Sequence, residues 1–362
     1  MSFLIQAVLT GLVLFAVINF AAIHTWLERK QSAVIQDRIG ANRAKIFGVK
    51  ALGLFHPLAD AIKMFTKEDY IPPFGNAFLH TLAPFLSMTF ALVAFAAIPF
   101  GDILRIGNME IPLQAAPINV GILYVFAMLS MGVYGVILAG FSSNSNYAFL
   151  GGMRASSQML AYEITLGATI LGLVMIYGTL DLQEMVRRQG ELLWGWLPKW
   201  GFLLQPVSFF LFLAAGIAET KRIPYDIPEG ESEIIGYFVE YSGMKFGIFY
   251  FVDFLETILL ACLTTTLFFG GWQIPFLDRA GFYFPWINGG ATPAVLLPHL
   301  VVTFLQVGSF IFKVVFFCWL FMMIRWTLPR FRYDQLMRLG WKIIFPLALL
   351  NLLITSAVLI LV

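Results

Sequence analysis

Long apolar stretches separated by polar segments run through the whole chain. Eight of them are long enough, or nearly so, for a helix to cross about 30 Å of hydrocarbon. They lie near residues 3–23, 77–99, 118–140, 157–180, 202–218, 246–270, 299–325 and 341–361. The pattern predicts an all-α integral membrane protein. We expect one polytopic domain over residues 1–362, with about eight transmembrane helices and large loops after helices 1 and 5.

One polar segment, residues 46–68, has a helical pattern of its own. Its apolar side chains recur at roughly helical spacing, with charged residues between them. The apolar positions are Val49, Leu52, Leu54, Phe55, Leu58, Ile62 and Phe65, and the charged ones are Lys50, Asp60, Lys63 and Lys67. A charged face with low net hydrophobicity is typical of an amphipathic helix lying in the membrane interface. The alternative, a ninth span, is disfavoured by its charges.

The composition fits a protein that is surrounded by lipid. Of the 362 residues, 59% are apolar and 12% are charged, whereas roughly a quarter are charged in soluble domains. The formal net charge of +2 gives no indication of a nucleic-acid partner.

The distribution of lysine and arginine predicts the orientation, because these residues gather in cytoplasmic loops. The loops at 24–76, 141–156, 219–245 and 326–340, with their helix edges, hold 17 of the 23 basic residues. The loops on the other side hold five, Arg105, Arg187, Arg188, Lys199 and Arg279. We therefore expect the first set of loops in the cytoplasm and both termini in the periplasm.

Ionisable side chains inside the predicted helices are candidates for function. They are Glu163, Asp253, Glu256 and Lys313. Such groups are costly in lipid and commonly mark ion or proton pathways. Asp253 and Glu256 are three residues apart and share one helix face, which makes proton uptake by the pair feasible. The alternative is a buried ion pair with Lys313 that only fastens helices together.

The loop at 219–240 is acidic, although it lies on the side where basic residues prevail. Its acids are Glu219, Asp226, Glu229, Glu231, Glu233 and Glu240. Pro224 and Pro228 restrict the backbone, and apolar residues interleave with the acids. These features favour a folded, partly buried loop over the alternative of a solvated acidic one.

Several redox sites are excluded by the sequence. The two cysteines, Cys262 and Cys318, lie in apolar stretches, so neither a disulfide framework nor an iron–sulfur cluster with about four thiolates can form. The four histidines are not spaced as axial ligands of a haem. No glycine-rich nucleotide-binding motif follows a predicted strand. We expect no metal or cofactor on this chain, so that any electrons arrive on a partner.

Four segments together resemble a known family, the quinone-pocket membrane subunit of proton-pumping NADH–quinone oxidoreductase (respiratory complex I). This protein is called H in bacteria and 1 in mitochondria. The segments are residues 28–43 (ERKQSAVIQDRIGANR), 57–73 (PLADAIKMFTKEDYIPP), 147–163 (YAFLGGMRASSQMLAYE) and 218–243 (AETKRIPYDIPEGESEIIGYFVEYSG). The chain departs from the family pattern at Ala41, where proline is usual, and at Asp253, where glutamate is usual. The shorter Asp253 keeps an acid but changes its reach.

The resemblance implies a membrane protein that anchors the hydrophilic arm of the complex and couples NADH-dependent quinone reduction to proton translocation. Its partners would be hydrophilic-arm subunits at a quinone chamber and adjacent small membrane-arm subunits. Quinone would be the substrate, whereas NADH, FMN and the iron–sulfur clusters would belong to partner subunits. We expect a bacterial inner membrane as the location rather than a mitochondrial one.

The resemblance also implies two sets of site residues, none of them a catalytic redox group. The first cytoplasmic loop, the interfacial helix and the acidic loop would form the mouth and lower wall of the quinone chamber. The chamber residues would be Glu28, Arg29, Lys30, Gln36, Arg38, Asn42, Arg43, Asp60, Lys63, Phe65, Arg222 and Asp226. The proton path would use Glu163, Glu219, Glu229, Glu231, Glu233, Glu240, Asp253 and Glu256.

Two other functions remain open from the sequence. One is the homologous membrane anchor of an energy-converting hydrogenase, which reduces no quinone; the segments QDRIGANR and PEGESE favour the quinone enzyme. The other is a stand-alone cation or proton transporter. Such transporters often have two similar halves with broken helices, and the apolar stretches contain no matched pair of interruptions.

Overall fold

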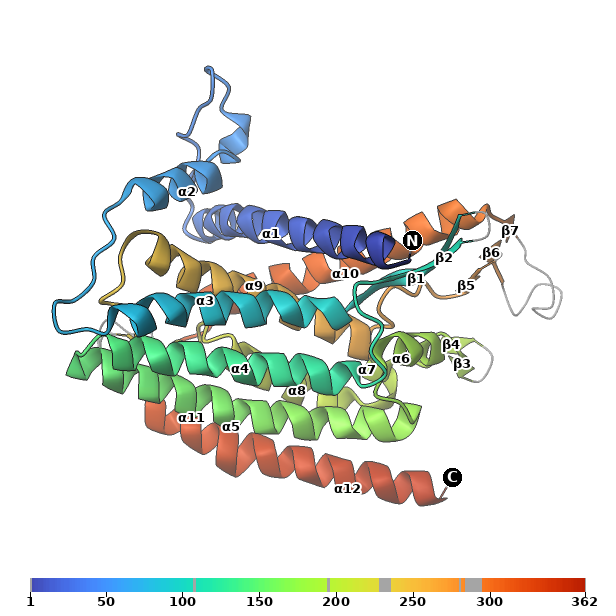
Figure 1. Ribbon diagram of the computed structural model, residues 1–362. Helices are drawn as coiled ribbons and strands as arrows, with labels where there is room; N and C mark the ends of the chain where they lie inside the picture. Colours follow the sequence, from blue (N-terminus) through green and yellow to red (C-terminus); the bar gives the residue numbers. More distant parts are fainter. Residues whose placement is uncertain are drawn as a thin grey trace.

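The chain forms an antiparallel bundle of helices. The structure is a computed structural model that describes residues 2–106, 109–193, 196–227, 236–279, 281–283 and 295–361. Within them, seven helices are long and apolar enough to cross a membrane. Figure 1 shows that both termini lie at the end of the bundle that carries the β-strands, here called the strand end. The opposite end, which carries α2, is called the loop end.

The bundle consists of eight helices, seven long ones and the shorter α8. They are α1 (Ser2–Ile35), α3 (Ala77–Ala94), α4 (Gly121–Ser142), α5 (Asn146–Tyr177), α8 (Pro206–Glu219), α9 (Gly243–Phe268), α10 (His299–Thr327) and α12 (Phe345–Leu361). The short helices are α2 (His56–Thr66), α6 (Leu182–Gln189), α7 (Gly201–Leu204) and α11 (Tyr333–Leu339), which continues through a π-helical turn (Gly340–Ile344) into α12. Short 3₁₀ turns lie at Ala51–Gly53 and Phe95–Ala97.

Three small antiparallel sheets lie at the strand end and were not predicted. The largest pairs β1 (Pro99–Ile106) with β2 (Met109–Gln114). The others consist of strands of two residues each: β3 (Leu192–Leu193), β4 (Leu197–Pro198), β5 (Leu277–Asp278), β6 (Gly281–Phe282) and β7 (Val295–Leu296). Because all of them connect helices outside the bundle, the predicted all-α membrane fold is confirmed.

Two helices are longer than the apolar pattern predicts. Helix α1 continues to Ile35, so Glu28 lies inside a helix rather than in a loop. Helix α5 begins at Asn146 instead of near residue 157, which turns much of the predicted loop 141–156 into helix. In the segment 46–68, only the 3₁₀ turn and α2 are helical. Helix α2 has 11 residues, none of them buried, which is too short for a ninth span.

The fifth apolar stretch is a broken helix. Helix α7 ends at Leu204, and α8 starts with Pro206, whose ring cannot continue a preceding helix. The side chain of Gln205 fills the break and donates to the Thr355 hydroxyl of α12 at 2.6 Å. Asn351 of α12 donates to the Gln205 side-chain oxygen at 2.7 Å. Polar side chains that bond across helices in this way hold the broken segment against α12.

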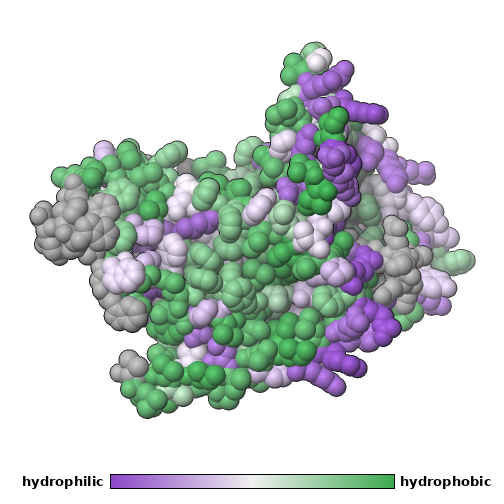
Figure 2. Space-filling model, turned by 180° about the vertical axis from the view of Figure 1, so that it is seen from behind, coloured by the Kyte–Doolittle hydropathy of each residue, from purple (hydrophilic) through white to green (hydrophobic). Residues whose placement is uncertain are grey.

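Helix α9 forms the centre of the bundle and is the most buried of the spans. Figure 2 shows that apolar side chains cover much of the outer surface, while hydrophilic ones gather at the loop end. Helices α4 and α5 approach closely because Gly140 faces Gly152, as is common for small residues between membrane helices. The buried α9 therefore brings its two acids into the middle of the protein.

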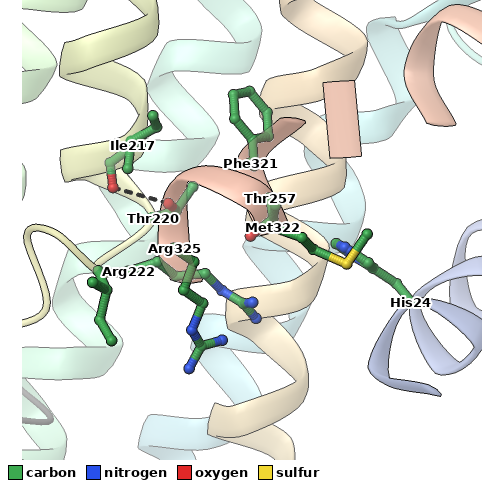
Figure 3. Close-up of a pocket in the computed structure, with 9 residues that line it drawn as sticks. His24, Ile217, Thr220, Arg222, Thr257, Phe321, Met322 and Arg325 are labelled. Carbon is green, nitrogen blue, oxygen red and sulfur yellow. Dashed lines mark hydrogen bonds between the residues drawn. The ribbon is translucent and has the colours of Figure 1, made fainter. Parts of the chain in front are cut away.

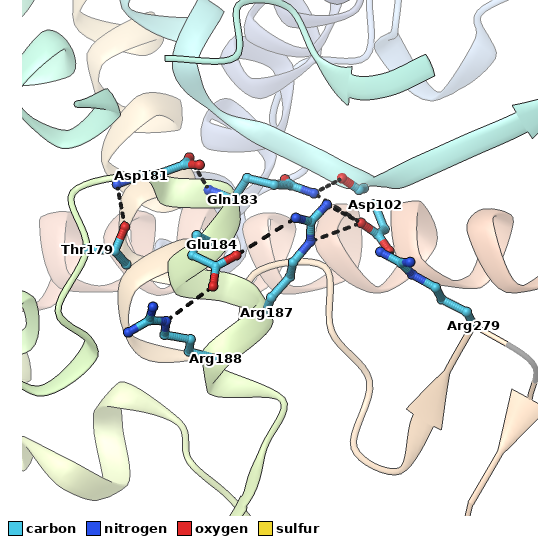
Figure 4. A network of polar contacts seen from close by, with 9 residues as sticks. Asp102, Thr179, Asp181, Gln183, Glu184, Arg187, Arg188 and Arg279 are labelled. Carbon is cyan, nitrogen blue, oxygen red and sulfur yellow. Dashed lines mark hydrogen bonds and ion pairs between the residues drawn. The ribbon is translucent and has the colours of Figure 1, made fainter. Parts of the chain in front are cut away.

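A buried carboxylate ties the strand end together (Figure 4). Asp102 of β1 accepts hydrogen bonds at 2.9 Å from Arg187 of α6 and at 2.9 Å from Arg279, which follows β5. Burial by itself raises the pKa of Asp102, but the hydrogen bonds and charges of the two arginines lower it further, to a net value below its ordinary one. Three segments that are distant in the sequence are thus fastened to one charge.

We expect Asp102→Asn to destabilise the strand end by about 1–2 kcal/mol at pH 7, a value at the low end because both arginines are partly exposed. A lowered carboxylate pKa stabilises the folded state above the unfolded pKa, and this contribution is lost as the pH falls through the folded pKa. The thermal unfolding temperatures of variant and parent should therefore differ at pH 7 and converge in acid.

Glu110→Gln is the matched control, because Glu110 pairs with Arg105 at 2.9 Å in the same hairpin while both side chains are more than half exposed. It should leave the unfolding temperature nearly unchanged. Equal effects of the two variants would contradict a special role for Asp102.

Candidate functional site

Glu28 is the centre of the first buried charge cluster. It lies near the loop end of α1 and accepts from Arg222 at 2.7 Å and from Arg325 of α10. The Arg222 guanidinium also lies 4.1 Å from the ring centroid of Phe254 on α9. Two guanidiniums compensate the buried carboxylate with charge-assisted hydrogen bonds, so the cluster joins α1, α9, α10 and the segment after α8.

Lys221 is the centre of the second cluster. Its Nζ lies 3.2 Å from Asp253 and 3.3 Å from Glu256 on α9, and all three side chains are buried. Burial lowers the pKa of Lys221, but Glu256 and Asp253 outweigh it and raise the net value well above the ordinary one. Lys221 therefore carries its charge between the two acids.

Lys313 does not pair with these acids, so the alternative of a Lys313 ion pair is wrong. Its Nζ donates to the backbone carbonyls of Phe269, Gly271 and Gln273 at 2.9, 2.9 and 2.6 Å. These carbonyls follow the last turn of α9, where helix carbonyls need donors and a cation is favourable. Lys313 thus caps α9 near the strand end.

Two further acids continue from the second cluster towards α4. Glu219, the last residue of α8, is buried, and both of its carboxylate oxygens are without a hydrogen-bond partner among the described residues. It borders a small cavity together with Glu256 and is close enough to Glu256 and Glu163 for electrostatic interaction. Glu163 of α5 accepts from the Ser130 hydroxyl of α4.

These groups form a continuous sequence of buried or half-buried side chains across the protein, here called the charged row. Its members are Glu163, Glu219, Glu256, Asp253, Lys221, Arg222, Glu28 and Arg325. Charged groups this deep in a membrane protein mark ion or proton pathways. Acids placed in succession can pass protons between them, while the three basic residues keep the remaining carboxylates compensated.

The other predicted chamber residues lie at the loop end. Arg29 pairs with Asp60 of α2 at 2.5 Å, and Lys63 lies 3.6 Å from the same carboxylate. Arg38 donates to Gln36 at 2.6 Å on the exposed segment after α1. Lys30 and Asn42 are partly exposed there, and Arg43 and Phe65 are exposed. Asp226 is buried and pairs with Arg330 at 2.6 Å.

The acidic loop is described only at its two ends. Asp226, Tyr237 and Tyr241 are buried, so both ends are folded against the bundle as predicted, and Glu240 is half-buried. Glu229, Glu231 and Glu233 lie outside the described residues. Burial raises the pKa of Tyr241 to about 12, although the Ser142 hydroxyl bonded to it acts in the opposite direction.

Sequence reasoning missed four partners of the predicted acids: Lys221, Arg325, Arg330 and Ser130. A signal existed for Lys221, because it follows directly on the fifth apolar stretch and precedes six residues of buried or half-buried loop. Ser130 has no such signal, since serines are common in membrane helices. Among the residues that the structure describes, no group of three or more His, Cys, Asp or Glu side chains could hold a metal ion.

Comparison with known proteins gives one consistent family. A family model described as NADH dehydrogenase matches residues 8–356. An H-type NADH-quinone oxidoreductase subunit of Cytophaga hutchinsonii is 44% identical over 92% of this chain and 90% of its own length. The H-type subunits of Flavobacterium johnsoniae and Thermomicrobium roseum are 40% and 41% identical, over 99% and 98% of this chain and 96% of their own lengths.

Proposed function

The chain belongs to the family of H-type subunits of NADH-quinone oxidoreductase, and on this premise we propose that it is the quinone-chamber and proton-path component of a bacterial complex I. It has no role as a redox carrier in this proposal. NADH, FMN and the iron–sulfur clusters belong to partner subunits, and quinone is the substrate reduced beside this chain. Kinship with NADH-quinone oxidoreductases favours this function over a hydrogenase anchor or a stand-alone transporter.

The observation that carries the proposal is the charged row. It starts at Glu28 near the loop end and reaches Glu163 on α5 without leaving the protein interior. Reduction of a quinone head group changes charge and takes up protons. Carboxylates beside it respond to that change, which supports a proton path that begins at the chamber.

The loop end is proposed as the cytoplasmic side and as the docking surface for the hydrophilic-arm subunits. The excess of basic residues in its loops supports this orientation, and hydrophilic side chains gather there (Figure 2). Both termini, which lie at the strand end (Figure 1), would then be periplasmic. The exposed residues of the first loop and α2 would meet the hydrophilic arm and line the chamber mouth.

Glu163→Gln is expected to lower proton pumping by about threefold or more while the complex still assembles, because an amide keeps the shape of the side chain but cannot carry its proton. Glu240→Gln should act in the same direction. The measurement compares proton uptake per NADH oxidised in membrane vesicles. Wild-type pumping in both variants at unchanged quinone reduction would count against the proton path.

Arg38→Ala is expected to lower quinone turnover by about two- to fivefold, the range for loss of one charged contact to a substrate or partner. The side chain is exposed and bonds to Gln36, so its removal should not disturb the fold. Turnover is measured as NADH-dependent reduction of a soluble quinone, with the exposed Arg338 replaced by alanine as the control. Loss of assembly in Arg38→Ala would make Arg38 structural instead.

A further inference from the structure

A small cavity lies beside the Glu28 cluster, between four segments of the bundle (Figure 3). Its polar lining comes from His24 of α1, Thr220 and Arg222 after α8, Thr257 of α9 and Arg325 of α10. The cavity has room for about one water molecule. It touches both arginines that hold Glu28, and His24 is not among the site residues predicted from the sequence.

Three of the lining side chains have polar atoms without a hydrogen-bond partner among the described residues. Both ring nitrogens of His24 are buried and unsatisfied, and so are Nε of Arg222 and Nε of Arg325. The side chain of His24 has no exposed surface. Buried polar atoms are nearly always satisfied by protein or by ordered water, so four unsatisfied atoms around one cavity indicate a bound molecule.

We propose that the cavity binds a single ordered water molecule and that His24 is the residue that orients it. The two arginine Nε–H groups can only donate, and the oxygen of a water accepts two such bonds. Its two hydrogens can then be donated to a ring nitrogen of His24 and to a threonine hydroxyl. Thr220 and Thr257 leave their oxygens free to accept, because their hydroxyls donate to Ile217 at 3.0 Å and to Asp253 at 2.7 Å.

The surrounding charges favour water over an ion. The groups packed around the cavity and the adjacent cluster are three cations, Lys221, Arg222 and Arg325, and three carboxylates, Glu28, Asp253 and Glu256. These charges balance, so no net charge remains for an ion to neutralise. An anion would also be unable to donate to His24, and a cation would face two guanidiniums. A neutral molecule that both donates and accepts fits the lining.

The water site makes His24 a positioning residue for the Glu28 cluster. By holding Nε of both arginines, the water fixes the guanidiniums so that their terminal nitrogens point at the Glu28 carboxylate. His24 fixes the water in turn. This role rests on the proposed function, in which the Glu28 cluster is the part of the charged row next to the quinone chamber.

The test compares three variants in the assembled complex: His24→Phe, His24→Gln and Met322→Leu. Phenylalanine keeps the ring but removes both acceptors, whereas glutamine retains an acceptor oxygen. Met322 lines the same cavity without a polar contact to the arginines, so its replacement controls for packing. Each complex is examined by a density map at a resolution that shows ordered water, and by quinone reduction and proton pumping in vesicles.

We expect a water peak within hydrogen-bond distance of both arginine Nε atoms in the wild type, His24→Gln and Met322→Leu, and no such peak in His24→Phe. Proton pumping should fall by about three- to tenfold in His24→Phe, the range for losing one buried hydrogen bond, and recover to within about twofold in His24→Gln.

The proposal is overturned if the wild-type map has no water there, if His24→Phe pumps like the wild type, or if His24→Gln is as defective as His24→Phe. Should His24→Phe fail to assemble, the maps of the wild type and His24→Gln still decide. A complex without NADH–quinone activity would refute the proposed function, while the density at the cavity would still answer for the water site.

Discussion

Lys221→Met is expected to remove most of the assembled complex from the membrane. The substitution leaves Asp253 and Glu256 as two carboxylates, one helical turn apart and buried, without the ammonium that lies 3.2 and 3.3 Å from them. Breaking a buried ion pair by removing one partner costs about 3–5 kcal/mol, which is a large part of the stability of a typical domain. The amount of complex on a native gel and its thermal unfolding temperature measure the loss.

The defect should persist throughout the physiological pH range. The raised pKa of Lys221 in the folded protein means that its stabilisation is complete below the unfolded pKa and is lost only as the pH rises through the folded pKa. Variant and parent should therefore differ by the same amount at pH 6 and pH 8, and both values lie below the ordinary lysine pKa of about 10.4.

A second substitution separates lost charge compensation from lost packing. Glu256→Gln added to Lys221→Met removes one of the uncompensated charges and should recover part of the assembled complex, as a positive coupling energy in a double-mutant cycle. Lys199→Met is the surface control, because Lys199 pairs with Glu191 at 2.7 Å in a partly exposed position and should cost little. A wild-type level of complex in Lys221→Met would refute the role of the pair.

The acids of the charged row were predictable because lipid makes each charge costly. Asp253, Glu256 and Glu163 interrupt apolar stretches, and a charge within a span has few explanations apart from function. The partner of the first two was not predictable in the same way. Lys221 lies outside any span, and only the fold of the segment after α8 carries it back to α9. The lysine that does lie within a span, Lys313, caps backbone carbonyls instead.

The strand end was unpredictable for a different reason. Hydropathy identifies helices because lipid requires a long apolar segment whose backbone is satisfied internally. Outside the bundle this requirement ends, and strands of two residues such as β3 leave no periodic signal. Asp102 shows the consequence: it is buried in a predicted loop, held by two arginines that the sequence separates from it by more than 80 positions.

Glu219→Gln is expected to reduce proton pumping to about a tenth or less, because a side chain that must take up and release a proton in the pathway cannot be replaced by an amide. Glu219 is the member of the charged row whose oxygens have no hydrogen-bond partner among the described residues. An uncompensated carboxylate at that depth is costly unless it carries a proton. The neutral amide should therefore leave assembly and thermal stability unchanged, so that the loss of pumping is seen in an intact complex.

Proton uptake per NADH oxidised in vesicles, together with the unfolding temperature, separates function from stability in Glu219→Gln. Glu219→Asp keeps an acid with a shorter reach and should retain part of the pumping. Glu184→Gln is the matched control, since Glu184 is an exposed acid of α6 at the strand end that pairs with Arg188 at 3.2 Å. If Glu219→Gln pumps like Glu184→Gln, protons do not pass through Glu219, and the charged row between α5 and α9 is structural at that point.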